Sequence, residues 1–301
     1  MIRQFKNSIR KNMPELLLSL FREIKKNRQR KILERKKINR EFITEELLVK
    51  DLVAIGLREG DTVLVHSSMS RIGYLEEGPK TVINALLQVT GKNGTLLFPS
   101  SPAPGLTKDY LEQNSCFDIL NTPSAMGAIT EYFRKMEGVK RSFHPTEPVC
   151  ALGPRAEYFI KDHYGQLTPY NSFSPFYKVS EQGGKIVMLG VTLDNAGTSL
   201  HTLEDAVDFK FPVYDEKIYE VNMIDEKGHS SVVKTKVHNP VFSAKRKCDE
   251  LIPLFEKEGV LKKGRVGEAP TLFIDAKGMF EVMVKYYHEK EVTMYTPEGA
   301  S

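Results

Sequence analysis

Short apolar runs that alternate with helical segments constrain the fold of this chain most strongly. The run Asp61–His66 is typical of a short buried strand, Pro79–Val89 predicts a helix, and Gly94–Pro99 predicts the next strand. This order indicates parallel pairing through a right-handed crossover. A further apolar run, Lys185–Val191, predicts another buried strand. The pattern therefore favours the α/β class.

The C-terminal third predicts further elements. Residues 218–224 and 231–237 alternate apolar and polar side chains on either side of Gly228, which predicts an antiparallel hairpin. We expect helices over Ser243–Glu258 and Lys277–Lys290. The stretch Gly267–Ile274 predicts a polar turn and a strand.

The positive charge of the chain is concentrated at its N-terminus. Residues 1–40 carry 14 Lys/Arg and 3 Asp/Glu, a net charge of +11, whereas the remainder is mildly acidic at −7. Helical spacing of apolar residues predicts a basic helical arm over residues 1–43, followed by one domain over residues 44–295. The favoured interpretation of the arm is a solvated extension. The alternatives are contact with an anionic membrane face or with a partner helix. Nucleic-acid binding is disfavoured because no aromatic residues interleave the charges.

Composition suggests a reducing compartment. The three cysteines, Cys116, Cys150 and Cys248, are scattered and form no CxxC motif, which argues against a disulfide framework or a zinc site. The longest apolar run near the start, Leu16–Leu18, is too short for a signal peptide or a membrane span. We therefore expect a cytoplasmic protein. Because of the basic arm, a location at the inner face of the membrane is the alternative.

The segment Thr198–Asp205 contains the most suggestive pair of side chains, His201 and Glu204. It follows the strand predicted over Lys185–Val191, and open α/β sheets bind their ligands beyond strand ends. In a helix, residues three apart share one face, so the imidazole and the carboxylate would lie side by side. A carboxylate orients a neighbouring imidazole, which suits a general base and equally a structural polar pair.

Three other polar stretches are candidates for binding. Ser67–Met69, in a polar turn expected after the strand at Asp61–His66, could present N–H and hydroxyl groups to an anion, or simply cap the strand. Arg141 and His144 share a bend that could grip a phosphate or be a surface turn. Asp118 could bind a substrate ammonium or form a turn. No nucleophile elbow, Walker loop, dinucleotide fingerprint or zinc-binding spacing is present in the sequence.

Several short motifs, taken together, resemble the antibiotic N-acetyltransferase family, best known for aminoglycoside 3-N-acetyltransferases. They occur in the family's order between about residues 45 and 290, as follows: Val65-His-Ser-Ser-Met with Gly73, Gly94-Thr-Leu-Leu-Phe-Pro, Phe117-Asp with Thr122-Pro, Met126-Gly with Glu131 and Arg134, Arg141-Ser-x-His-Pro, Ala151-Leu-Gly, Ser174-Pro, Gly184-Lys-Ile-Val-Met-Leu-Gly-Val, and Thr198-Ser-Leu-His-x-x-Glu204.

The resemblance implies a three-layer α/β/α fold with a central mixed sheet and an acetyl-CoA-dependent N-acetyltransferase that needs no metal. The catalytic histidine of the family falls on His201, with Glu204 as its orienting partner. A backbone N–H or a Ser hydroxyl, with Ser68 as the candidate residue, would stabilise the oxyanion. The match implies cofactor contacts at the following residues: Ser67, Ser68, Met69, Ser124, Arg141 and His144.

The acceptor amine stays open at this level. The expected substrate-side loops hold few acidic residues, among them Asp109, Glu112 and Asp118, a thin lining for a polycation. We therefore expect an amino sugar of a surface polysaccharide first and an aminoglycoside second. A catalytically inactive CoA-binding or membrane-surface scaffold is the alternative of another class. The sequence also leaves open whether the protein forms a homodimer.

Overall fold

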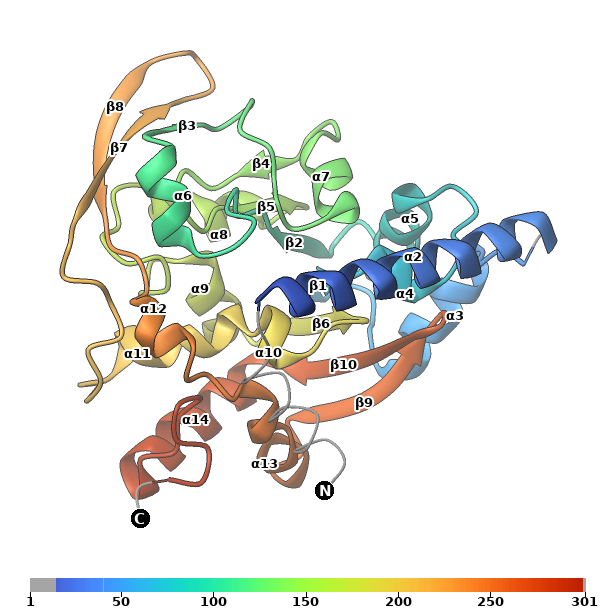
Figure 1. Cartoon of the computed structure of the whole chain (residues 1–301). Coiled ribbons are helices and arrows are strands. Elements are labelled where there is room, and N and C mark those ends of the chain that lie inside the picture. Colours follow the sequence, from blue (N-terminus) through green and yellow to red (C-terminus); the bar gives the residue numbers. More distant parts are fainter. Residues whose placement is uncertain (1–14, 40, 300–301) are drawn as a thin grey trace.

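The computed structural model describes residues 15–39 and 41–299 (Figure 1). Its strands are β1 (Thr62–Ser67), β2 (Thr95–Pro99), β3 (Cys116–Asp118), β4 (Lys140–Arg141), β5 (Val149–Leu152), β6 (Lys185–Leu189), β7 (Tyr219–Ile224), β8 (Ser230–Thr235), β9 (Leu261–Val266) and β10 (Ala269–Asp275). Seven of them form a mixed sheet in the order β4-β5-β2-β1-β6-β10-β9.

The helices surround this sheet. The longer ones are α2 (Glu15–Asn39), α3 (Glu45–Ile55), α5 (Pro79–Thr90), α6 (Thr107–Gln113), α7 (Ala128–Arg134), α9 (Pro175–Glu181) and α14 (Ala276–Lys290). The shorter ones are α4 (Met69–Ile72), α8 (Ala156–Ile160), α10 (Leu193–Ala196), α11 (Thr202–Ala206), α12 (Pro240–Ser243) and α13 (Ile252–Lys257), with the 3₁₀ turns η1 (Lys161–His163), η2 (Thr198–His201) and η3 (Cys248–Leu251).

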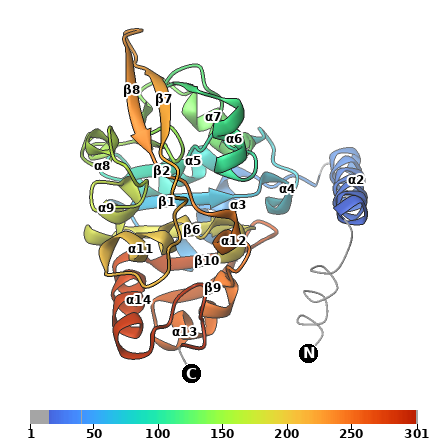
Figure 2. The same cartoon turned by 60° about the vertical axis from the view of Figure 1, so that its left-hand side comes forward.

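Both faces of the central sheet are buried. Successive side chains of a strand point to opposite faces, so Leu64 joins the core beneath α8, α9 and α14, while its neighbours Val63 and Val65 join the core beneath α3, α5 and α7. Ile186 and Val187 divide in the same way. Helices therefore cover both faces (Figure 2), and the α/β/α fold with a mixed sheet is confirmed.

The parallel strands at the centre position the candidate site. β1 pairs in parallel with β2 on one side and with β6 on the other, where Ser67 is opposite Leu189. The carboxyl ends of β1 and β6 therefore meet at one edge of the sheet. The chain leaves this edge through α4 after β1, and through α10, η2 and α11 after β6. The predicted histidine segment thus lies beyond the ends of the central strands.

The predicted hairpin is confirmed as β7 and β8, which pair antiparallel from Tyr219 opposite Thr235 to Ile224 opposite Ser230. β3 pairs in parallel with β7 and completes a three-stranded sheet with its own small core, which includes Phe117 and Met223. The tip of this sheet projects from the body (Figure 2).

Three local predictions were wrong. The stretch after β1 is not a polar turn but the helix α4, whose Ile72 is buried. The helix predicted over Ser243–Glu258 is divided into α12, η3 and α13. Pro253 lies in the first turn of α13, where a proline is tolerated, whereas a proline in the interior of one continuous helix would break it. The edge strand β9 was missed because its central residues, Lys262–Arg265, are exposed and polar.

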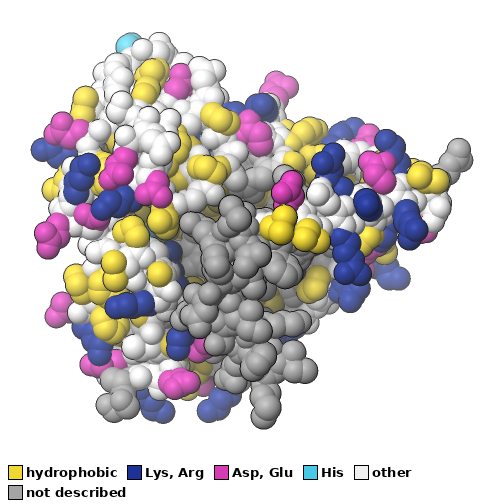
Figure 3. Space-filling view, in the orientation of Figure 1, with side chains coloured by type: hydrophobic (Ala, Val, Ile, Leu, Met, Phe, Trp, Pro, Cys, Tyr) yellow, Lys and Arg dark blue, Asp and Glu magenta, His cyan; other side chains and the backbone are white. Residues whose placement is uncertain are grey.

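The predicted basic helix forms α2, which Figure 2 shows nearly end-on at one side of the body, while residues 1–14 and 40 of the predicted arm lie outside the described residues. Gln29 Nε2 donates to the carbonyl of Ser70 at 2.7 Å, and Lys36 pairs with Glu268. Leu20 and Ile24 are 51% and 56% exposed, and basic side chains gather over the helix (Figure 3). In the described part of the chain no helix is long and apolar enough to cross a bilayer.

Candidate active site

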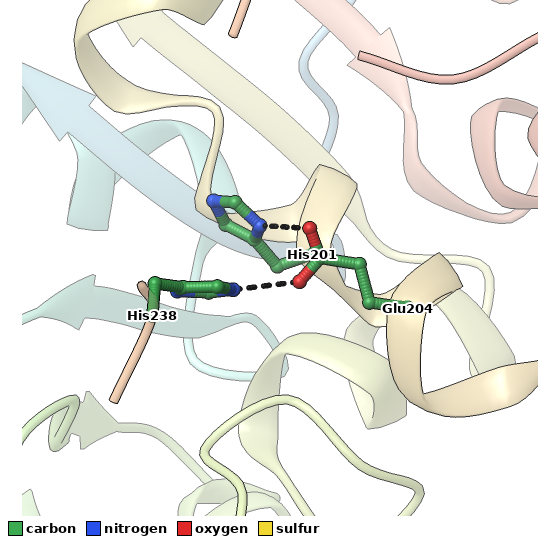
Figure 4. Close-up of side chains that lie close together, drawn as sticks. All are labelled: His201, Glu204 and His238. Carbon is green, nitrogen blue, oxygen red and sulfur yellow. Dashed lines mark hydrogen bonds and ion pairs between the residues drawn. The ribbon is translucent and has the colours of Figure 1, made fainter. Parts of the chain in front are cut away.

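The imidazole of His201 and the carboxylate of Glu204 lie side by side, as their spacing predicts. His201 ends η2 and Glu204 lies in the next turn, α11, so the two side chains share one face. Nδ1 of His201 is 2.9 Å from Oε1 of Glu204 (Figure 4). Both side chains are buried, at 6% and 0% exposure.

Two residues from distant parts of the sequence complete this cluster. His238 follows β8, and its Nε2 donates to Oε2 of Glu204 at 2.6 Å (Figure 4). Tyr295 follows α14, and its hydroxyl donates to Oε1 at 2.6 Å. The ring of Tyr170 lies 4.9 Å from that of His201 and 5.6 Å from that of His238, measured between centroids. None of these three residues lies in a recognisable motif, so the sequence does not predict their part in the cluster.

Glu204 fixes the tautomer of His201, and burial keeps the imidazole neutral. Burial alone would raise the pKa of Glu204, but the charges and N–H donors of His201 and His238 outweigh it and hold the pKa well below its usual range. An ionised carboxylate only accepts hydrogen bonds, so Nδ1 of His201 carries the hydrogen and Nε2 keeps a free lone pair. Burial lowers the pKa of His201 to about 3. The imidazole is therefore neutral at pH 7, as a general base must be.

The cluster also has the composition of a metal site. One ligand atom from each of His201, Glu204 and His238 lies within 4.8 Å of the others. However, nitrogen–oxygen distances of 2.9 and 2.6 Å are those of hydrogen bonds. Glu204 already accepts three such bonds, one of them from Tyr295. A zinc ion would have to replace the ring hydrogens that make these contacts, so the observed arrangement fits a hydrogen-bonded base rather than a metal centre.

A pocket of about 240 Å³ opens beside the cluster. His201 and His238 form part of its wall, and its other lining residues include the following: Met126, Glu147, Tyr170, Thr198 and Arg246. Burial raises the pKa of Glu147 to about 8. The pocket therefore places the neutral imidazole of His201 on the wall of a cavity that a ligand could enter.

The candidate cofactor residues at the end of β1 lie close to this pocket. Ser67 is the last residue of β1, and Ser68 and Met69 begin α4, all three partly buried. His66, just before them, has Nε2 3.5 Å from Oγ1 of the pocket residue Thr198. The amide of Ser68, an expected oxyanion donor, is already committed because it donates to the carbonyl of Leu189 at 2.8 Å.

Ser124 lies just before α7. Its amide donates to Oε2 of Glu131 at 2.9 Å, and its hydroxyl accepts from the amide of Met126 at 3.1 Å. Because Met126 lines the pocket, Ser124 helps to shape the loop on that side.

Arg141 and His144 are buried inside the loops instead of gripping an exposed phosphate. Arg141 donates to the carbonyls of Ser100 and Thr122, both at 2.6 Å. Burial lowers its pKa to about 10. His144 is fully buried, with its ring stacked 4.4 Å from that of His163. Neither residue is part of the pocket lining.

Asp118 is also outside this pocket. Its Oδ1 accepts from the amides of Leu120 and Asn121 at 2.9 and 2.8 Å, and its Oδ2 accepts from the side chain of Asn121. These contacts are those of an Asp that forms a turn, which was the second interpretation of this residue from the sequence.

Comparison with known proteins places this site in a family. The model of the family described as aminoglycoside 3-N-acetyltransferase matches residues 64–288. The span includes the strands of the central sheet and the pair His201 and Glu204. The chain therefore belongs to this family and is an acetyl-CoA-dependent N-acetyltransferase.

Individual relatives agree along most of the chain. Aminoglycoside N(3)-acetyltransferase VII of Streptomyces paromomycinus is 28% identical over 267 residues, which are 81% of this chain and 91% of the relative. A solved structure of AAC-IIIb in a binary complex with CoASH is 30% identical, with a TM-score of 0.70 over 82% of this chain and 97% of the other. A structure of aminoglycoside acetyltransferase AAC(3)-IVa in complex with a gentamicin is 27% identical, with a TM-score of 0.69 over 82% and 89%.

Proposed function

We propose that this enzyme transfers the acetyl group of acetyl-CoA directly to a primary amine of an aminoglycoside, with His201 as the general base. One observation carries the proposal. The Nδ1–H of His201 is held by Glu204, and the same ring forms part of the pocket wall. The neutral imidazole therefore has Nε2 free for a proton of the acceptor.

The proposed reaction needs no acyl-enzyme. The amine nitrogen attacks the thioester carbonyl, the new C–N bond forms, and the carbonyl electron pair moves onto oxygen. Nε2 of His201 takes a proton from the attacking nitrogen. The intermediate then collapses, the C–S bond breaks, and CoA leaves as a thiolate that accepts the proton. Glu204 stabilises the imidazolium that exists between these steps.

The names of the relatives support an aminoglycoside, which the sequence alone placed second. A solved relative binds a gentamicin, and several carry aminoglycoside N(3)-acetyltransferase in their names. A simpler amino sugar is the second candidate. It is favoured by the small acidic lining of the pocket, Glu147 and Asp194, because burial raises the pKa of Glu147 to about 8 and so reduces the negative charge that it offers to a polycation.

The contacts of CoA are proposed at Ser67, which ends β1, and at Ser68 and Met69, which begin α4 next to the pocket. Ser124 is proposed to act through the loop that carries Met126. For Arg141 and His144 we propose an indirect role, in which they hold the loops around the cofactor from within.

The decisive experiment is His201→Gln with acetyl-CoA and a panel of aminoglycosides and simple amino sugars. A lost base should lower kcat by ~10²–10⁴-fold while the Kd of CoA is retained. His229→Gln, an exposed histidine in the hairpin turn, is the matched control and should leave kcat unchanged. A His201 variant with the kcat of the wild type would contradict the assignment of His201 as the base. The amine with the highest kcat/KM in the panel is the preferred acceptor.

A further inference from the structure

The guanidinium of Arg246 is an unexplained charge in the pocket. Arg246 lies between α12 and η3, and it is the one Lys or Arg among the pocket-lining residues that the structure describes. Its Nε and Nη2 atoms are buried and have no hydrogen-bond partner. Buried donors without an acceptor are costly, at roughly 1–3 kcal/mol each. Two such donors beside a catalytic pocket indicate that a ligand oxygen completes them.

Arg246 is joined to the base through other side chains. Its charge interacts with Tyr295, whose hydroxyl donates to Glu204. Burial opposes its charge, but Tyr295, Tyr170 and Glu204 raise its pKa above the usual value, so it stays a cation. The guanidinium and the imidazole of His201 thus belong to one network at one pocket.

Acetyl transfer needs hydrogen-bond donors for the thioester oxygen, because that oxygen becomes negative when the amine attacks. Several backbone donors near the pocket are already used. The amide of Ser68 donates to Leu189, that of Ala196 to Thr192, and that of Gly197 to Leu193. The free donors of Arg246 therefore match an unmet need of the reaction.

We propose that Arg246 binds the thioester oxygen of acetyl-CoA through its Nε–H and Nη2–H and stabilises the oxyanion of the tetrahedral intermediate. The two N–H groups lie side by side on a planar fork and can both point to one oxygen. They donate hydrogen bonds only. The proton of the amine still goes to His201, and the electron pair returns from oxygen when the C–S bond breaks. This inference rests on the proposed acetyl transfer at the same pocket.

The test compares Arg246→Gln and Arg246→Lys with wild type on several amines. Loss of an oxyanion donor costs ~10²–10³-fold in kcat. We expect a fall of that size for Gln and a smaller one for Lys. The factor should be the same for every acceptor, with the KM values of amine and acetyl-CoA nearly unchanged. Added guanidinium ion should restore part of the turnover of Arg246→Ala. Arg155→Gln, a surface change whose side chain contacts Gln182, is the control.

Two outcomes would overturn the proposal. A loss that differs among amines and lies in their KM would place Arg246 against the acceptor, and unchanged kcat in the Gln variant would remove it from the chemistry. If wild type acetylates no amine, the proposed function fails instead. The Arg246 step is then measured on hydrolysis of acetyl-CoA, which forms the same oxyanion with water as nucleophile. Equal hydrolysis rates in wild type and Arg246→Gln would then refute it.

Discussion

The hydroxyl of Tyr295 lies 2.6 Å from Oε1 of Glu204, the same oxygen that accepts from Nδ1 of His201. A segment that follows the last helix is thereby bonded to the carboxylate that orients the imidazole of His201. Glu204 is held from three directions, since His238 donates to its other oxygen. A carboxylate fixed in this way holds the imidazole in one tautomer and one orientation.

Tyr295→Phe should lower kcat without changing the affinity for CoA. The substitution removes one hydrogen bond to a charged group, worth roughly 1.5–3 kcal/mol, so a loss of about 10- to 100-fold is expected if all of it is felt in the transition state. Tyr286→Phe is the matched control, because it removes a similar hydroxyl contact, to Glu258, far from the pocket. Steady-state kinetics of both variants check the prediction, and equal kcat values would contradict it.

Stability should rise with pH between about pH 5 and 6.5. Burial lowers the pKa of His66 to about 4, of His144 and His201 to about 3, and of His163 well below its usual value. The unfolded chain binds protons at these groups below about pH 6.5 and the folded protein does not. Each histidine therefore adds up to ~1.4 kcal/mol per pH unit to the slope.

The buried carboxyl of Glu147 acts in the opposite sense. Its pKa is raised to about 8, so the stability that it contributes is present below its ordinary pKa and is lost as the pH rises through 8. Burial also raises the pKa values of Asp194 and Asp205, which act in the same sense, but these three carboxyls are outnumbered by the four histidines. Urea unfolding at pH 5, 6 and 7 measures the net slope. Replacing His144 by Gln should reduce this slope by the contribution of one histidine, up to ~1.4 kcal/mol per pH unit. A free energy of unfolding that stays constant or falls as the pH rises would contradict the lowered pKa values of the histidines.

Arg141→Met should destabilise the fold before it affects cofactor binding. The change leaves the buried carbonyls of Ser100 and Thr122 without their donor, which should lower the free energy of unfolding by about 3 kcal/mol. Arg155→Met is the surface control. Urea unfolding and the Kd of CoA are measured on the same samples. A variant of normal stability with weakened CoA binding would return Arg141 to the direct contacts expected from the sequence.

We propose that the basic arm binds anionic membranes. The exposed Leu20 and Ile24 lie on a helix rich in Lys and Arg, and each basic residue near such a surface contributes ~1 kcal/mol. Full-length protein should float with vesicles that contain phosphatidylserine, and a variant without residues 1–40 should not. Binding should weaken as salt is raised, because screening shortens the reach of the charges. Equal flotation of both proteins would leave the solvated extension as the explanation.

Local patterns predicted the parts of the structure that depend on neighbouring residues. The buried strands β1, β2 and β6 are continuous apolar runs, and the pair His201 and Glu204 depends only on the geometry of one turn. Such patterns do not reveal which residues from distant parts of the sequence the fold brings into contact. His238 is 34 positions from Glu204, and Tyr295 is 91 positions away.

The motif Arg-Ser-x-His-Pro shows a second limit of local patterns, which concerns burial. Its residue types suit a phosphate site, but whether Arg141 and His144 face solvent or the interior depends on the loops that cover them. The carbonyls that Arg141 binds come from two other segments, at Ser100 and Thr122, and the ring that packs on His144 comes from His163. Burial at these positions is a property of the assembled fold and could not be predicted from the bend alone.

The separation of Glu204 from Tyr295 has a consequence for biosynthesis. The ribosome makes His201 and Glu204 together, then His238, and adds Tyr295 only 91 residues after Glu204. A nascent chain that has already closed β1, β2 and β6 into their parallel sheet thus still lacks one of the donors to its carboxylate. Glu204 therefore gains the hydroxyl donor of Tyr295 only when the segment after α14 docks, which is among the last steps of folding during synthesis.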